Sequence, residues 1–203
     1  MTPRGVRDDR GQTLPIYIWL TAIVLFAALA VFVFAQAASA RNGAQSAADA
    51  AALAAAQQAR DELVLDLGDV IGEDADWLDW LDLPGEALTV GDAEAAARQL
   101  AADNDSAVEA FQQRQVDGRP GFQVDVRTNY AVGESIIPGT ENMRARASAT
   151  AVIQPRCDFS LDADPAQPVE LNCDGEPVNI DPEDFDPDDL PDASVMFSVH
   201  LAE

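Results

Sequence analysis

The stretch that decides the fold runs from Leu14 to Ala35 and reads LPIYIWLTAIVLFAALAVFVFA. A bilayer core about 30 Å thick takes roughly 20 helical residues, and this run supplies 22. A backbone inside lipid must satisfy its own hydrogen bonds, so the run is expected to be helical. The sequence therefore predicts one transmembrane helix over residues 13–36, with the lipid bilayer as its first partner.

The flanking arginines predict the orientation of this helix. Arg4, Arg7 and Arg10 precede the span, whereas only Arg41 and Arg60 follow it closely. The positive-inside rule then assigns the N-terminus to the cytoplasm. We expect a single-pass protein of the cell membrane with residues 1–12 cytoplasmic and the C-terminal domain extracytoplasmic.

A cleaved signal peptide is the competing interpretation of the same run. The triplets Ala35-Gln36-Ala37 and Ala38-Ser39-Ala40 resemble the small-residue sites at which signal peptides are cut. The apolar run is longer than the usual 7–15 residues of a signal peptide, which favours a retained anchor. In both cases the bulk of the chain lies outside the cytoplasm.

An Ala-rich segment over residues 37–67 continues the helical pattern as a predicted stalk. Alanine is the best helix former, and the first part of this segment contains only one glycine, Gly43, and no proline. Composition alone favours packing on the protein's own domain. The alternative is that the small face lets neighbouring helices approach closely. The candidate helix-packing residues are Ala47, Ala48, Ala51, Ala52 and Ala55.

Two short motifs resemble those of TadE/TadG-like pilus-assembly proteins. Residues 9–12 read DRGQ before the span, and residues 45–56 read QSAADAAALAAA after it. The resemblance covers residues 8 to about 60. It implies a pilin-like component of the tight-adherence (Flp) machinery that crosses the membrane once and has no catalytic residues. It also implies association with other pilus or secretion-system membrane proteins, as a homo- or hetero-oligomer through the N-terminal helix.

One position departs from the pattern of prepilins that the dedicated peptidase cuts. Such proteins carry a glycine before the cut and a glutamate five residues after it. Gly11 is present here, but the fifth residue after it is Ile16. The departure favours a stably anchored, TadG-like protein over a processed major pilin.

Composition excludes several functions. The formal net charge of -24 repels phosphate backbones, so no nucleic-acid partner is expected. Two cysteines and one histidine are too few ligands for a structural zinc site or an iron–sulfur cluster. The chain has no nucleophile elbow, no H-E-x-x-H motif and no phosphate loop. We therefore predict a protein that is not an enzyme and has no cofactor.

The rest of the chain predicts an α+β domain over residues 68–156, completed by a C-terminal strand within 194–203. The pattern over Asp92–Gln115 predicts an amphipathic helix, with a break at 103–106 as an alternative. Alternating apolar residues predict strands at Phe122–Tyr130, Arg144–Ile153 and Val195–Leu201. Helices packed on such a small antiparallel sheet resemble the pilin plan.

Trp77, Trp80 and Leu81 lie on one face of a short predicted helix. The simplest interpretation is that this helix buries its two tryptophans against the domain. The alternative is an exposed aromatic patch that docks a partner, because tryptophan is enriched at interface hot spots.

Residues 157–193 form an acidic, Pro-rich excursion that is predicted to be partly mobile. Outside the cytoplasm its two cysteines, Cys157 and Cys173, are expected to form a disulfide. Asp184, Asp186 and Asp188 have the first spacings of a calcium loop. The glycine and the glutamate that such a loop needs are missing, which leaves a weak calcium site only as an alternative.

These observations favour a membrane-anchored, pilin-like structural or assembly component of a tight-adherence pilus or a related secretion system. The runner-up is a secreted or anchored extracytoplasmic binding module, with weak calcium binding as one variant.

Overall fold

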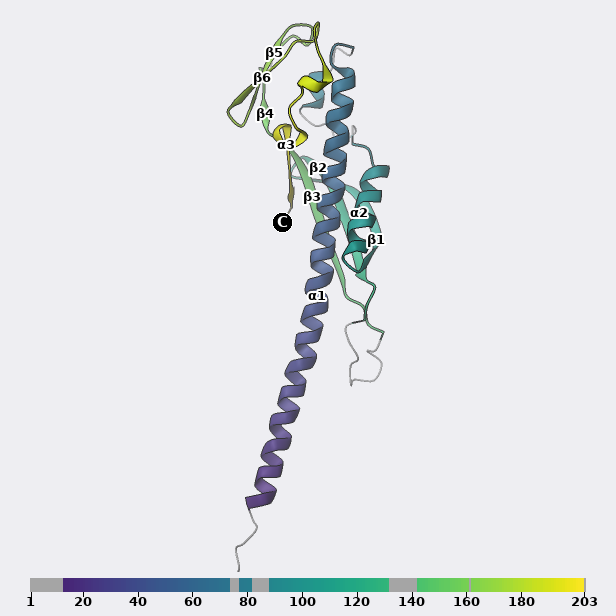
Figure 1. Ribbon diagram of the computed structural model, residues 1–203, viewed down its shortest axis with the longest axis vertical. Coiled ribbons are helices and arrows are strands. Elements are labelled where there is room, and N and C mark those ends of the chain that lie inside the picture. Colours follow the sequence, from purple (N-terminus) through teal and green to yellow (C-terminus); the bar gives the residue numbers. More distant parts are fainter. Residues whose placement is uncertain (1–12, 74–76, 82–87, 132–141, 161, 203) are drawn as a thin grey trace, which may run out of the picture.

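The structure, a computed structural model, describes residues 13–73, 77–81, 88–131, 142–160 and 162–202. Figure 1 shows one long helix, α1, that extends far below a small domain of helices and strands. The predicted mixed α+β class is confirmed. The elements are α1 (Thr13–Val70), η1 (Trp77–Trp80), α2 (Gly91–Asp103), β1 (Ser106–Val116), β2 (Arg119–Thr128), β3 (Arg146–Pro155), β4 (Cys157–Asp158), β5 (Val169–Cys173), β6 (Glu176–Ile180), η2 (Pro187–Asp189), α3 (Ala193–Met196) and β7 (Phe197–Leu201).

Helix α1 is continuous from Thr13 to Val70, and its 58 residues give a length of about 90 Å. It ends just before Gly72, whose positive φ of 83° favours glycine. The carbonyl oxygen of Pro182 lies 2.7 Å from where a Cβ of residue 72 would stand. A side chain there would therefore push residues 157–193 away from the end of the helix.

The Ala-rich segment 37–67, which was predicted as a stalk, packs into the α+β domain, so the domain begins before the predicted boundary at residue 68. From Ala40 onward one face of α1 is buried in the same core as the sheet. The buried alanines lie in rows four residues apart, and α2 presents Ala93, Ala97 and Ala101 at the same spacing. Facing rows of alanine let the two helices approach closely, so the segment forms the core of the domain. Its buried alanines are Ala40, Ala44, Ala47, Ala48, Ala51, Ala52, Ala55, Ala56 and Ala59.

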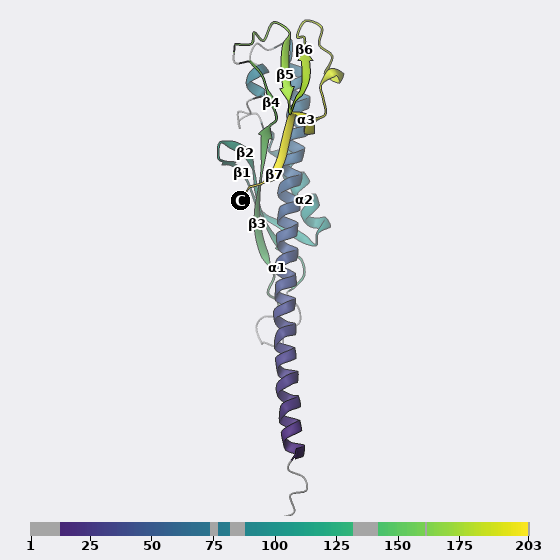
Figure 2. The ribbon, with the colours of Figure 1, turned by 90° about the vertical axis from the view of Figure 1, so that its left-hand side faces the viewer.

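The main sheet has the strand order β1-β2-β3-β7, and every neighbouring pair is antiparallel. The alternation that predicts the central strands is confirmed, because Phe122, Val124 and Val126 are at most 1% exposed. Helix α1 packs on β2, β3 and β7, whereas α2 packs on α1 and β1 (Figures 1 and 2). The predicted cytoplasmic residues 1–12 lie outside the described residues.

The predicted helix over Asp92–Gln115 is wrong in its second half. Helix α2 ends at Asp103, and residues 106–116 form β1, which makes the sheet four-stranded. A bulge between Val108 and Ala110 shifts the register, so the apolar residues of β1 do not alternate along the strand. β1 is also an edge strand, much of which faces solvent. Both features hide the period of two that predicts a strand from sequence.

We call residues 157–193 the cap, and its described residues form regular structure where a partly mobile loop was expected. β4, β5 and β6 form a second antiparallel sheet, and Val169, Leu171 and Ile180 are at most 3% exposed. Beyond the cap, the predicted last strand begins two residues later than expected. Val195 and Met196 belong to α3, and only Phe197–Leu201 pair with β3.

The alanine rows predict a sharp position dependence for larger side chains. Ala52→Leu is expected to lower the free energy of unfolding by about 1–3 kcal/mol, because the fully buried position has no room for the added carbons. Gln57→Leu on the exposed side of the same helix is the control and should change it by less than about 0.5 kcal/mol. Chemical unfolding in detergent measures both. Equal effects of the two variants would contradict the packed-core interpretation.

Candidate functional site

The first third of α1 is a bare apolar surface. All of its large apolar side chains from Leu14 to Phe34 except Val33 are exposed; Trp19, for example, is 72% and Phe34 76% exposed. The helix is long and apolar enough to cross a membrane, and the most apolar window of 18 residues contains nothing buried. The Thr21 hydroxyl donates to the carbonyl oxygen of Tyr17 at 2.8 Å, which satisfies this polar group within the helix. This helix indicates a single-pass membrane protein.

The candidate helix-packing alanines lie in the second part of α1, beyond its exposed apolar part. Ala47, Ala48, Ala51, Ala52 and Ala55 are all fully buried against the protein's own α2 and sheet. A partner helix has no access to them. The structure therefore supports the interpretation that composition favours, packing on the protein's own domain, over a face for a neighbouring helix.

Gly43 marks the lower end of this packed region. The hydroxyl oxygen of Tyr130 lies 2.3 Å from where a Cβ of residue 43 would stand, so the tyrosine rests directly on the helix backbone. Thr128 is fully buried, and its hydroxyl donates to the Tyr130 carbonyl oxygen at 2.8 Å, which helps to hold Tyr130 in this position. Because Gly43 has no side chain, Tyr130, which follows β2, can pack directly on the backbone of α1.

The aromatic patch proposed from Trp77, Trp80 and Leu81 is not exposed as a unit. Trp77 is fully buried and Leu81 is 2% exposed, while Trp80 is half-buried. The Trp77 indole N–H donates to the carbonyl oxygen of Pro165 in the cap at 3.0 Å. This burial favours the simpler interpretation, in which the short helix packs its tryptophans against the domain, over a docking patch. Through Trp77, η1 also contacts the cap.

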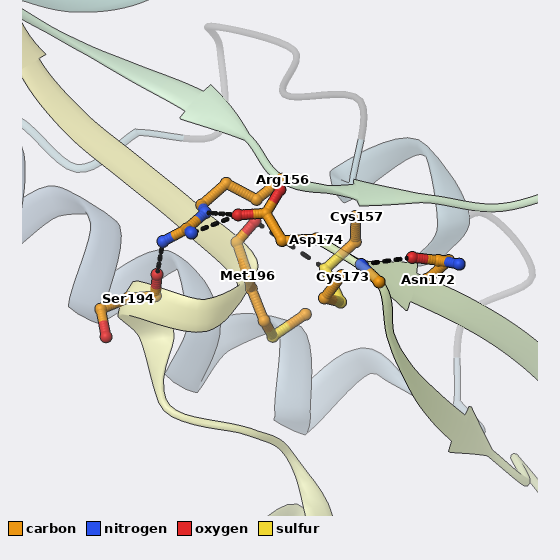
Figure 3. The surroundings of a disulfide bond; sticks show 8 residues. Arg156, Cys157, Asn172, Cys173, Asp174, Ser194 and Met196 are labelled. Atoms are coloured by element: carbon orange, nitrogen blue, oxygen red, sulfur yellow. Dashed lines mark hydrogen bonds and ion pairs between the residues drawn. A yellow bond between two sulfur atoms is a disulfide. The ribbon is translucent and has the colours of Figure 1, made fainter.

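A disulfide joins Cys157 to Cys173, as the sequence predicts (Figure 3). The two residues are direct cross-strand partners in β4 and β5. The next two residues, Asp174 and Gly175, form a two-residue turn with positive φ at both positions, which is the hairpin geometry that the sequence Asp-Gly favours. The Asn172 side-chain oxygen accepts from the Gly175 N–H at 2.7 Å and closes this turn.

Arg156 ties the disulfide to the rest of the molecule (Figure 3). Its guanidinium pairs with the carboxylate of Asp174, with an Nε to Oδ2 distance of 2.7 Å, and Nη1 donates to the carbonyl oxygen of Ser194 at 2.9 Å. Its backbone N–H donates to the carbonyl oxygen of Met196 at 2.9 Å. One arginine between the two sheets therefore connects β3, the β5–β6 turn and α3.

The aspartates of the calcium alternative serve a local structural purpose. A carboxylate oxygen of Asp186 accepts from the backbone N–H of Asp188 at 3.0 Å, which caps the short helix η2. Asp184 and Asp188 are exposed. Within the described ranges, no group of three or more His, Cys, Asp or Glu residues has the geometry to hold a metal ion. The structure thus does not bring the three aspartates together as ligands.

Two carboxyl groups have lowered pKa values. Burial acts to raise the pKa of Glu62, but hydrogen bonds from Gln58 and Thr89 and an interaction with Asp92 outweigh it, and the net shift is downward. The pKa of Asp192 is lowered by hydrogen bonds from the hydroxyl and backbone N–H of Ser194, which cap α3. Both shifts favour the ionised form of these hydrogen-bonded carboxylates.

The fold and the exposed helix indicate a single-pass membrane protein with an α+β domain beyond the span. Residues 11–58 of the chain match the model of a family described as putative Flp pilus-assembly TadE/G-like. The resemblance read from the motifs is confirmed over this segment, which covers about a quarter of the chain and belongs almost entirely to α1. Neither the curated proteins nor the solved structures contain a significant match to this chain.

Sequence analysis missed Arg156 and the two Asp-Gly turns that organise the strands. Asp117-Gly118 joins β1 to β2 and Asp174-Gly175 joins β5 to β6, both with positive φ. The dipeptide Asp-Gly between extended segments is the signal that predicts such hairpins. Arg156 carries no comparable signal, because its partners come from segments far apart in the chain.

Removal of the disulfide is expected to destabilise the cap. The bond closes a loop of 15 residues, so the double variant Cys157→Ala/Cys173→Ala should lose about 3 kcal/mol of unfolding free energy. Denaturant unfolding with and without reductant measures the loss. Reductant should lower the stability of the native chain and leave the variant unchanged. A native chain indifferent to reductant would show that the bond contributes nothing.

Proposed function

We propose that the protein is a membrane-anchored, pilin-like structural or assembly component of a tight-adherence (Flp) pilus or a related secretion system. The observation that carries the proposal is the position of the family match at residues 11–58. The matched segment contains both the exposed apolar part of α1 and the first rows of buried alanine. The segment that matches the family therefore contains both the apolar span and the first part of the helix that packs into the domain.

The orientation proposed for this helix has the N-terminus in the cytoplasm. The three arginines that precede the span support it through the positive-inside rule. The disulfide in the cap supports it as well, because disulfides form and persist outside the cytoplasm. The outer domain, including the cap, then lies in the extracytoplasmic space.

The mechanism is mechanical, and we assign no catalytic step to the protein. The alanine face of α1 is occupied by the protein's own core. Association with other pilus proteins inside the membrane must therefore use the exposed part of the helix between Leu14 and Phe34. The same helix is packed into the outer domain. A contact between two spans therefore also determines where the outer domain of each protein lies.

A photo-crosslinking experiment tests the assembly role. A photoreactive residue in place of Leu25, which is 65% exposed in the span, should capture membrane proteins of the pilus machinery in cells that build such pili. Leu65 is 71% exposed on the same helix beyond the span and provides the matched control. Mass spectrometry identifies the products. Capture of no pilus component from position 25 in assembling cells would contradict the proposed function.

Anchoring is tested by removing residues 1–36. The shortened chain should leave the membrane fraction and stay folded, because the buried part of α1 begins at Ala40. Far-UV circular dichroism and an intact disulfide check the fold, and carbonate-washed membranes of cells with the full chain provide the control. A full chain that carbonate extracts would refute the anchor.

A further inference from the structure

The folded domain begins almost where the span ends. The apolar run closes at Ala35, and Ala40, which is 4% exposed, is the first buried residue of α1. Five helical residues rise by about 7.5 Å. The polar headgroup layer on each side of a bilayer is about 5–7 Å thick. A domain held this close to the span lies against the headgroups.

The end of the domain that faces the span is identified by a series of contacts. Tyr130 rests on Gly43, only eight residues past Ala35. Thr128 binds the carbonyl of Tyr130 and accepts from the backbone N–H of Ala145 at 3.2 Å, which brings Arg144 to the same level. Figures 1 and 2 agree that β2 ends and β3 begins at this lower end of the domain.

The side chains at this end are suited to a headgroup layer. Arg41 and Arg144 are exposed, and neither has an ion-pair partner among the residues that the structure describes. Met143 is 57% and Tyr130 41% exposed. Long arginine side chains bind phosphate while their stems lie on apolar surface, and tyrosine is enriched at membrane interfaces. We call these four residues the span-facing end.

The distribution of charge favours this end over the cap. The cap contains 13 acidic residues and no Lys or Arg, and it lies at the far end of the molecule in both ribbon views. Acidic residues also occur near the span-facing end: Asp103, Asp105 and Glu109 among the described residues, and Glu141 two positions before Met143 in the sequence. Glu109 is already neutralised, because it forms ion pairs with Arg127 at 2.6 Å and Arg146 at 2.9 Å. Phosphate groups are therefore repelled by the cap far more than by this end.

We propose that the span-facing end docks on the phospholipid headgroups of the bilayer that holds α1. Arg41 and Arg144 bind lipid phosphates, and Met143 and Tyr130 enter the interface. This contact fixes the tilt and rotation of the outer domain on the membrane. The inference rests on the proposed membrane anchor and adds a second contact with the same bilayer.

Fluorescence quenching of the full chain in vesicles tests the docking. The vesicles contain phosphatidylcholine and phosphatidylglycerol, with a nitroxide on some of the lipids. Single labels are attached at Met143→Cys, at Leu65→Cys as an exposed position far from the span, and at Phe26→Cys inside it. The native cysteines are bonded to each other and take no label. Lipid quenching should be severalfold stronger at positions 143 and 26 than at position 65.

Charge variants separate phosphate binding from mere proximity. Arg41→Gln/Arg144→Gln should reduce the quenching at position 143 severalfold. Arg114→Gln/Arg119→Gln is the matched control, since these arginines also have no ion-pair partner among the described residues but lie at the other end of β1 and β2. The control pair should leave the quenching unchanged. Equal effects of the two pairs, or no effect of either, would overturn the proposal.

The three label positions distinguish the possible failures. Quenching at position 26 with none at 143 would overturn the docking and leave the anchor intact. No quenching at position 26 would overturn the anchor and the docking together. A second copy of the chain could instead cover this end. The label at position 143 would then be protected from acrylamide but not quenched by lipid, and its protection would increase with protein density. That result would also overturn the proposal.

Discussion

The rest of the structure depends on the close approach of α1 to α2 and the sheet along rows of alanine. Only small side chains at positions such as Ala48 and Ala52 allow the backbones to come this near, and all of the positions between Ala44 and Ala59 that face the core are fully buried. Alanine buries little area, so larger residues such as Phe122 and Phe197 supply much of the apolar contact. The alanines thus set the distance between α1 and the elements packed on it, and the larger side chains fill the rest of the core.

The helix and the central strands could be predicted from the sequence because their patterns are local. A long apolar run can only become a helix in lipid, and Phe122, Val124 and Val126 alternate regularly on β2. β1 could not be recognised in the same way. Its bulge after Val108 breaks the alternation, and Val108 and Phe111 imitate the spacing of a helix.

The roles of the candidate site residues depend on the segments that pack against them. A local sequence pattern carries no information about those segments. The alanines between residues 47 and 55 suit a partner helix as well as their own domain, and only the fold shows that α2 lies there. Trp77 is placed by an acceptor on Pro165, 88 residues later in the chain. The arrangement of the second sheet likewise involves Arg156, the disulfide and the Asp174-Gly175 turn together.

The central claim is that one unbroken helix is both the membrane span and the core of the outer domain. The most direct test is a pulsed electron paramagnetic resonance distance between spin labels at Phe26→Cys and Leu65→Cys, with the full chain in a bilayer. The two Cα atoms are 39 residues apart on α1, which predicts one narrow distribution centred at about 58 Å. A broad distribution, or a clearly shorter distance, would show that the helix breaks between the span and the domain and would contradict the account.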